Sequence, residues 1–413
     1  MATVMPFKGI LYNPGKIADS ADVTTPPYDV ISPDDQAAFY ERHPNNVIRL
    51  ILGRARATDT ARDNPHTRSA AYYRQWMSQG ILKQGKQAAL YLKSITYVHE
   101  EKAITRYGLA ALIGLEPFEK RVILPYPDDG GVLSTLEQAV DKSAPIVDFR
   151  DDQGHRHRLW QILDPAIHRQ VAEAMRDKRL FIADGHHRYE TALNFRKHLK
   201  DTDPSFSDRH PANYVLMYLC SMNDPGLIIL PAHRLLKAVS MEDMRQAVEN
   251  ARNYFEVSEY PFTPGDRQRV EQNFLAALND RASRQCFGIY AHKSPVFYLL
   301  TLKTGVMDQL YKDELDASLR SLDVTVLTRL LFMKILGFDQ KRLDNEQLIG
   351  YASTADKALQ SIDTGAYDVA FILNPTRIEQ VQEVAQKGLI MPRKSTYFYP
   401  KVKSGLVMTT LME

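Results

Sequence analysis

The sequence predicts an α+β fold, with mixed sheets and helices in two domains. Its 413 residues correspond to two or three domains at roughly 150 residues each. Apolar residues make up 44% and charged residues 25%, which is typical of a globular chain. Helical patterns and strand-rich segments follow one another, and the pattern restarts after about residue 236. We therefore expect one domain over 1–235 and a C-terminal α+β domain over 236–413.

The N-terminal part predicts two helices and a hairpin. Ser32 followed by proline is typical of a helix start, and this helix is expected over 33–42. Residues 67–80 place apolar side chains on one helical face and end in a glycine, which indicates a second helix. Two strand-rich segments, 89–98 and 104–115, flank a polar stretch and predict a hairpin.

The rest of the chain predicts short strands and helices. A buried strand is expected over 179–183, running through an Asp-Gly turn into a helix. In the last predicted helix, Asn374 is the expected N-cap, Pro375 an early helical residue and Gly388 the C′ glycine. The other predicted elements are strands over 213–220, 227–230, 286–290, 296–302 and 367–373, and helices near 240–254, 265–279, 324–336 and 374–388.

Charge, cysteine content and hydropathy exclude several classes of protein. The chain has 52 Lys and Arg against 50 Asp and Glu, so its net charge of +2 provides no overall field for a polyanion. Cys220 and Cys286 offer neither a disulfide framework nor a cysteine-based zinc site. The N-terminus lacks a basic region followed by an apolar core, and no apolar run approaches the ~18 residues of a spanning helix. We expect a cytoplasmic protein without a membrane partner.

The strongest signal for chemistry is the run Asp184, Gly185, His186, His187 and Arg188. It begins a predicted helix, where backbone N–H groups have no partner within the helix and attract anions. Arg188 can hold a phosphate with two hydrogen bonds, and either histidine can donate another. Asp184 can hold Mg²⁺ that bridges phosphate oxygens. The run therefore predicts phosphoryl chemistry.

Two other interpretations of this run stay open. Asp184 and Gly185 form a common turn, and the histidines could be polar surface residues. A zinc site is less favoured, because His186 and His187 are adjacent instead of four residues apart and the His-Glu-x-x-His pattern is absent. The P-loop, Rossmann and Gly-x-Ser-x-Gly signatures are absent from the sequence as well.

Three further candidates lie elsewhere in the chain. Residues 393–403 mix basic and aromatic side chains that could hold phosphate and stack on a base, with Lys394 and Ser395 the best candidates; the alternative is that the aromatics pack into the core. Four cations in this segment and a near-zero net charge of the whole chain disfavour nucleic acid as a partner.

Arg234 is expected to follow a strand and to add a cation to the site, or to begin a surface helix. Asp29, after two prolines, is a candidate general base or an ordinary Asx turn.

Five motifs are spread over nearly the whole chain. They are Pro-Pro-Tyr-Asp-Val-Ile-Ser at 26–32, Phe-Ile-Ala-Asp-Gly-His-His-Arg-Tyr-Glu-Thr-Ala at 181–192, and the segments 224–234, 322–327 and 391–401. Together they resemble the domain-of-unknown-function 1015 family of prokaryotic proteins. The Asp-Gly-His-His-Arg motif also resembles that of free L-serine kinases of the ParB/sulfiredoxin-like superfamily. That local resemblance implies a ParB/sulfiredoxin-like nucleotide-binding element in the first domain, with ATP or ADP as ligand.

The chain departs from the expected family pattern at two places. Tyr126 and the following Asp128 and Asp129 stand where a His-Glu-x-Thr segment is expected, and Thr328 stands where a histidine is expected. If the missing groups bind metal or act in catalysis, this copy is altered, unless Asp128 or Asp129 replaces an acidic ligand.

These observations support hypotheses from different functional classes. The first is a Mg²⁺-dependent phosphotransferase that moves phosphate from ATP or ADP to a small hydroxylated metabolite, with L-serine implied by the resemblance. His186, His187 and Arg188 would bind the phosphates, Asp184 would position the metal, and Asp29 would act as base. The alternatives are a non-catalytic nucleotide-binding switch and a hydrolase of phosphate esters. The oligomeric state does not follow from the sequence.

Overall fold

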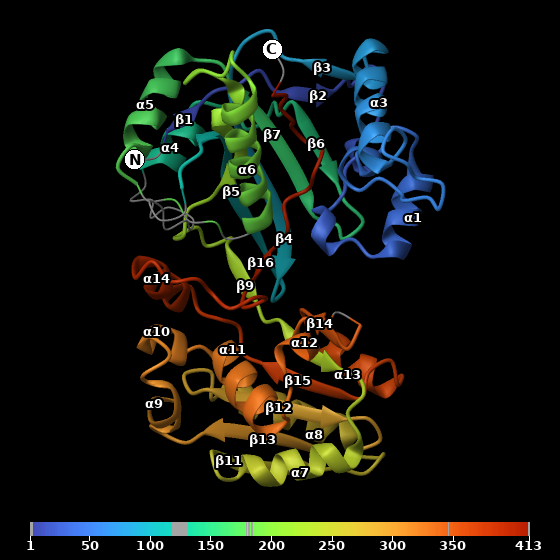
Figure 1. The fold of residues 1–413 in the computed structure, drawn as a ribbon, viewed down its shortest axis with the longest axis vertical. Helices are drawn as coiled ribbons and strands as arrows, with labels where there is room; N and C mark the ends of the chain where they lie inside the picture. The colour runs from blue at the N-terminus through green and yellow to red at the C-terminus, as the bar shows by residue number, and fades with distance from the viewer. Residues whose placement is uncertain are drawn as a thin grey trace. The chain divides into compact units, whose positions relative to one another are not determined.

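The computed structural model describes residues 3–117, 131–178, 180, 182, 185–345 and 347–411 (Figure 1). The chain forms two compact units: unit 1 is residues 1–228 with 400–413, and unit 2 is residues 229–399. The chain passes from unit 1 to unit 2 between residues 228 and 229, and residues 400–413, expected in the C-terminal domain, belong to unit 1. Both units combine helices with antiparallel sheets, which confirms the predicted α+β class.

Unit 1 is built on a six-stranded antiparallel sheet. The strand order is β1-β5-β4-β7-β6, and β8 also pairs with β5. The predicted hairpin is present as β4 (Leu90–His99) and β5 (Lys102–Gly114). The other strands are β1 (Val4–Met5), β6 (Val147–Arg150), β7 (Arg156–Ile162) and β8 (Tyr214–Leu219), while β2 (Ile10–Tyr12) and β3 (Leu82–Gln84) form a separate pair.

One face of this sheet is apolar. Leu92, Leu109 and Trp160 point to it and pack with α4 (Gly131–Gln138) and α5 (Pro165–Met175) in a single core. These side chains are 2% exposed or less, so the face is fully covered. The burial of this apolar face against α4 and α5 stabilises the packing of both helices on the sheet.

The opposite face buries charged side chains. Residues directly opposite one another on antiparallel strands share a face. Ile95 of β4 lies opposite Arg106 of β5 and His157 of β7, and Lys93 is two residues from Ile95, so these side chains lie on one face. Lys93, Arg106 and His157 are each 2% exposed or less. Farther along this face, Tyr91 packs among apolar side chains.

The helices of unit 1 follow their predicted capping signals. α1 (Pro33–Arg42) begins after the Ser32 N-cap, as predicted. α3 (Pro65–Ser78) begins before the predicted residue 67, because Asn64 caps it and Pro65 takes the first helical position. Of the predicted strand 179–183, Leu180 and Ile182 are described and are buried outside any strand. The other helices described in unit 1 are α2 (Ile48–Ile51), α6 (His186–Thr202) and the 3₁₀ turns Ser20–Asp22, Tyr28–Val30 and Pro211–Asn213.

Unit 2 is built on a second six-stranded antiparallel sheet, in the order β11-β13-β12-β15-β10-β14. Successive side chains of β12 alternate between two apolar cores. Phe287 and Ile289 pack with α7 (Met241–Ala251) on one face, and Cys286 and Tyr290 pack with α8 (Arg267–Asn279) and α13 (Ala355–Asp363) on the other. The strands are β10 (His233–Leu236), β11 (Phe255–Pro261), β12 (Cys286–Ala291), β13 (Val296–Leu302), β14 (Ile349–Ala352) and β15 (Val369–Leu373).

Two predicted helices of unit 2 differ in the structure. The helix expected over 324–336 is a short α11 (Asp323–Val326) followed by a π-helix, Leu327–Ile335, whose wider turn is seen in the bond from Leu336 N to Leu331 O (2.9 Å). The last helix, α14 (Ile378–Gln386), begins four residues after the predicted N-cap Asn374, whose side chain donates instead to the Leu278 carbonyl (3.0 Å). The remaining elements are α9 (Val306–Tyr311), α10 (Ala317–Arg320), α12 (Gln340–Leu343) and the paired strands β9 (Ile228–Leu230) and β16 (Tyr397–Tyr399).

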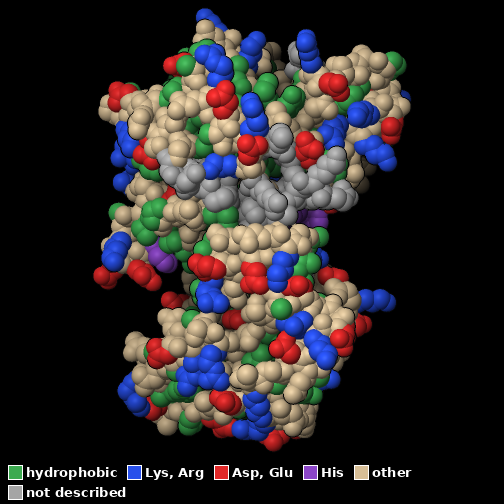
Figure 2. Space-filling view, turned by 90° about the vertical axis from the view of Figure 1, so that its left-hand side faces the viewer, with side chains coloured by type: hydrophobic (Ala, Val, Ile, Leu, Met, Phe, Trp, Pro, Cys, Tyr) green, Lys and Arg blue, Asp and Glu red, His purple; other side chains and the backbone are tan. Residues whose placement is uncertain are grey.

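The surface and the helices carry two further findings. On the face drawn in Figure 2, Lys and Arg side chains are interspersed with Asp and Glu on each unit, so neither sign of charge dominates there. Within the described ranges, every helix is too short or too polar to cross a lipid bilayer.

Candidate anion site at the start of helix α6

Helix α6 begins at a residue whose backbone conformation favours glycine. Gly185, the N-cap, has φ +84° and ψ 30°, in the left-handed region. A Cβ atom at this position would lie 2.8–2.9 Å from atoms of the Arg188 guanidinium. The Arg188 side chain therefore folds back over Gly185, at the N-terminus of the helix. A side chain at residue 185 would displace it.

The start of α6 is fixed to the end of β5. Tyr189 is 1% exposed, and its hydroxyl donates to the Glu116 carbonyl (2.8 Å) and accepts from the Glu116 N–H (2.9 Å). Arg196, two turns along, donates to the Leu115 carbonyl (2.6 Å). These bonds hold the first turn of the helix while its polar side chains face outward.

The first turn of α6 has a positive electrostatic character. The N-cap, Gly185, has no side chain to cap the helix, and the first turn contains no acidic residue. His186, His187 and Arg188 are exposed, and His187 Nδ1 lies 3.7 Å from Glu190 Oε2 in the following turn. The positive end of the helix dipole and a guanidinium are thus gathered at one point, an arrangement that binds anions such as phosphate.

Several predicted site residues cannot be placed beside this helix start. Asp184, the predicted Mg²⁺ ligand, and Tyr126, Asp128 and Asp129 of the altered segment lie outside the described residues. Asp29 is exposed in unit 1, in a single 3₁₀ turn that follows Pro27.

The other candidates lie together in unit 2. Arg234 is not at a helix start but in strand β10, and burial lowers its pKa to about 10. Its guanidinium donates to the Lys394 carbonyl (2.8 Å) and to the Ala232 carbonyl. It lies 4.8 Å from the centre of the Tyr351 ring, and Lys394 Nζ lies 5.4 Å from the same ring. Ser395 is buried. In unit 2, Arg234 and Lys394 therefore share one aromatic ring and a backbone contact.

A cluster that the sequence did not predict lies in unit 1. Asp151, His155 and His157 meet at the turn between β6 and β7. A possible signal is the His-x-His spacing at the start of a strand, because residues two apart on a strand share a face. That signal depends on β7 being a strand, and the polar start of this segment did not indicate one.

Comparisons with known proteins identify a family. The profile of a family described as protein of unknown function (DUF1015) matches residues 4–126 and 122–325. No curated protein matches the chain. A solved structure of a conserved hypothetical protein from Pyrococcus furiosus is 14% identical, with a TM-score of 0.31, over 56% of this chain and 75% of that one. Free serine kinase in complex with AMP, and a variant of it in complex with ADP, are each 15% identical, with TM-scores of 0.28, over 53% of this chain and 66% of theirs.

Proposed function

The chain belongs to the DUF1015 family, and we propose that it binds a nucleotide by its phosphates at the N-terminus of α6. The observation that carries this proposal is the placement of the Arg188 guanidinium over Gly185, at a helix start whose first turn has no acidic residue. The Asp-Gly-His-His-Arg motif, which resembles that of free L-serine kinases, supports a nucleotide as the ligand. On this proposal, unit 1 contains a ParB/sulfiredoxin-like nucleotide-binding element.

We further propose that the protein is a phosphotransferase. Arg188 and the two histidines neutralise the phosphates of ATP or ADP, and Asp184 holds Mg²⁺. The acceptor is a small hydroxylated metabolite, and L-serine is the first compound to test. Asp29 removes the proton of the acceptor's hydroxyl group. Arg234, Lys394 and Ser395 lie in unit 2 and stay separate candidates for phosphate binding in that unit.

The binding test compares Arg188→Ala with Arg209→Ala, which removes an exposed arginine elsewhere in unit 1. Loss of a charge-assisted phosphate contact should weaken ADP or ATP binding by about 1.5–3 kcal/mol, roughly 10- to 150-fold, in calorimetric titrations with Mg²⁺. The melting temperature should hardly change, because a cation at a helix N-terminus contributes little to stability. Arg209→Ala should bind as wild type. A lowered melting temperature with unchanged affinity would contradict the proposal.

A second experiment separates the enzyme from its alternatives. The protein is incubated with Mg²⁺, ATP or ADP, and L-serine or other hydroxylated metabolites, and products are followed by phosphorus NMR. A phosphorylated acceptor that is lost in Asp29→Asn supports the phosphotransferase. Nucleotide binding without any turnover supports the switch, and release of phosphate from an ester supports the hydrolase.

A further inference from the structure

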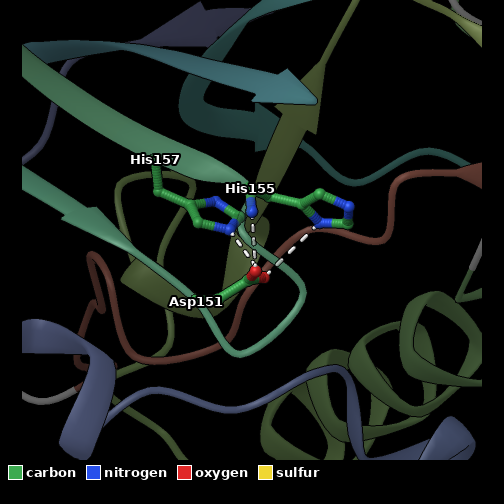
Figure 3. A group of neighbouring side chains, drawn as sticks. All are labelled: Asp151, His155 and His157. Atoms are coloured by element: carbon green, nitrogen blue, oxygen red, sulfur yellow. Dashed lines mark hydrogen bonds and ion pairs between the residues drawn. The ribbon is translucent and has the colours of Figure 1, made fainter. Parts of the chain in front are cut away.

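The cluster of Asp151, His155 and His157 lies apart from the residues assigned to nucleotide binding. Figure 3 shows the two imidazoles on one side of the β6–β7 turn, with the Asp151 carboxylate between them. His157 Nε2 lies 3.0 Å from Asp151 Oδ2, and His155 Nδ1 lies 3.5 Å from the same oxygen. All three side chains are less than a tenth exposed.

The turn fixes the carboxylate before any ligand binds. Asp151 Oδ1 accepts from the N–H groups of Gln153 and His155, both at 3.0 Å. Gly154 closes the turn with φ +77° and an N–H bond to the Asp151 carbonyl (2.8 Å). Because Oδ1 is already held, Oδ2 is the oxygen that faces the histidines. An outer group of hydrogen bonds that orients a ligand in this way is a feature of protein metal sites.

Two of the three separations between the ligand atoms are close to those of a tetrahedral metal site. The two histidine nitrogens lie 3.0 and 3.5 Å from Asp151 Oδ2, and all three atoms lie within 4.8 Å of one another. Zinc–ligand bonds of 2.0–2.1 Å in a tetrahedron correspond to ligand separations of about 3.3 Å. Two imidazoles and one carboxylate form a donor set that suits zinc and similar metals, and three protein ligands leave a fourth position for another group.

A side-chain cation already lies against the same oxygen. Lys403 Nζ is 3.1 Å from Asp151 Oδ2. The Lys403 side chain is 13% exposed, and the backbone of the next residue, Ser404, is paired with Thr25 (2.7 and 3.3 Å). A movement of the ammonium group alone would leave this backbone pairing intact. Lys93 and Arg106 lie on the same sheet face and also repel a cation, so binding requires that Lys403 leave.

We propose that Asp151, His155 and His157 bind one divalent transition metal of the zinc type, in exchange for the Lys403 ammonium. This site is independent of the proposed nucleotide function, since it shares no residue with the start of α6. It would give the chain a metal other than the Mg²⁺ expected beside the phosphates.

The test titrates chelator-treated, full-length protein with Zn²⁺, and with Co²⁺ as a spectroscopic probe. We expect one equivalent to bind and Co²⁺ to give the visible bands of a tetrahedral site. Asp151→Asn and His157→Gln should each weaken binding about 100-fold or more. His210→Gln, which removes a histidine elsewhere in unit 1, should leave the affinity unchanged. If Asp151→Asn fails to fold, His155→Asn replaces it in the titration and should also weaken Zn²⁺ binding. X-ray absorption of the zinc-loaded wild type should then show two histidine ligands.

Lys403→Met provides the sharpest discrimination. Removing the competing ammonium should tighten Zn²⁺ binding about tenfold. If neither wild type nor Lys403→Met binds a stoichiometric metal, the cluster is an ion-pair network and the proposal is overturned. It is also overturned if the histidine variants bind Zn²⁺ as wild type does, or if inorganic phosphate, rather than metal, raises the melting temperature in a way that Lys93→Met abolishes.

Discussion

The two six-stranded sheets have the same strand number and the same antiparallel pairing, yet they bury different chemistry. In unit 2, both faces pack into apolar cores, and the buried charged or imidazole side chains among the described residues of the sheet are His233 and Arg234 in β10. In unit 1, one face is apolar and the other buries Lys93, Arg106 and His157. Buried charged groups cost free energy unless they are paired. Arg106 donates to the Pro400 carbonyl and His157 pairs with Asp151, whereas Lys93 Nζ has no hydrogen-bond partner among the described residues.

The largest effect is expected where unit 2 is most tightly packed. Phe274 is fully buried, stacks on Phe297 at 5.0 Å and lies against Gly288, where a Cβ would meet its ring at 2.4 Å. Phe274→Ala should destabilise unit 2 by about 3–5 kcal/mol. Hydrogen exchange resolved by peptide should show the loss in unit 2 but not in unit 1. The exposed Phe195→Ala in α6 is the control, and an equal loss there would contradict this comparison.

On the polar face of unit 1, replacing a buried side chain is expected to stabilise the protein instead of destabilising it. Lys93 Nζ has no hydrogen-bond partner among the described residues, and burial, with repulsion from Arg106, lowers the pKa of Lys93 well below its usual value. Lys93→Met fills the same space without an unpaired amine, so it should stabilise unit 1 by about 2–3 kcal/mol. Peptide-resolved exchange measures this as well. Lys83→Met on β3 removes an exposed lysine and should be neutral; a destabilised Lys93→Met would show that the amine is paired.

A pH effect is expected from a buried carboxyl group of unit 2. Burial raises the pKa of Asp323, in α11 of unit 2, to about 7, although Arg377 opposes the shift. Between pH 4 and 7 the folded chain keeps this proton and the unfolded chain releases it, so the free energy of unfolding falls as pH rises. Asp323→Asn lacks this contribution. The free energy of unfolding of Asp323→Asn, relative to wild type, should rise by about 2 kcal/mol from pH 4 to 8, a value reduced for the partial exposure of Asp323. Parallel curves of stability against pH for the two proteins would contradict the raised pKa of Asp323.

The smallest effect should be equal in both units, because their helix caps are alike. Asp35 N–H donates to Ser32 Oγ (3.1 Å) and Asp243 N–H to Ser240 Oγ (3.0 Å), and each aspartate accepts from the serine N–H in return. Ser32→Ala and Ser240→Ala should each cost about 1 kcal/mol, measured as the shift in the denaturation midpoint of the unit concerned. Unequal losses would mean that one of the two serines also stabilises contacts outside its helix cap.

Features that depend on neighbouring residues could be predicted from the sequence, and features that depend on distant ones could not. Ser32 and the glycine at 388 act within a turn of their helices, and both predictions are confirmed. Asn374 failed as a cap because its amide donates to Leu278, almost a hundred residues away. The cluster at Asp151 is completed by Lys403, which no local pattern connects to it.

The candidate sites follow the same rule. The run Gly185 to Arg188 could be proposed from the sequence because its glycine, helix start and arginine are consecutive. Arg234 does follow a strand, β9, but its burial in β10 depends on Tyr351 and Lys394, which arrive late in the chain. The polar face of unit 1 depends on the register of three strands, and register is set by pairing across the sheet.

The return of residues 400–413 to unit 1 affects the order in which the two units can complete their folding during synthesis. Ile10 and Met408 exchange backbone hydrogen bonds at 2.8 and 2.9 Å, and Thr25 pairs with Ser404. Unit 1 begins the chain but lacks these partners until synthesis has passed through unit 2. Unit 2, by contrast, is one continuous stretch, 229–399, and has emerged in full before the final contacts of unit 1 can form. Unit 1 is therefore completed only after unit 2 has been synthesised, although most of its residues are translated earlier.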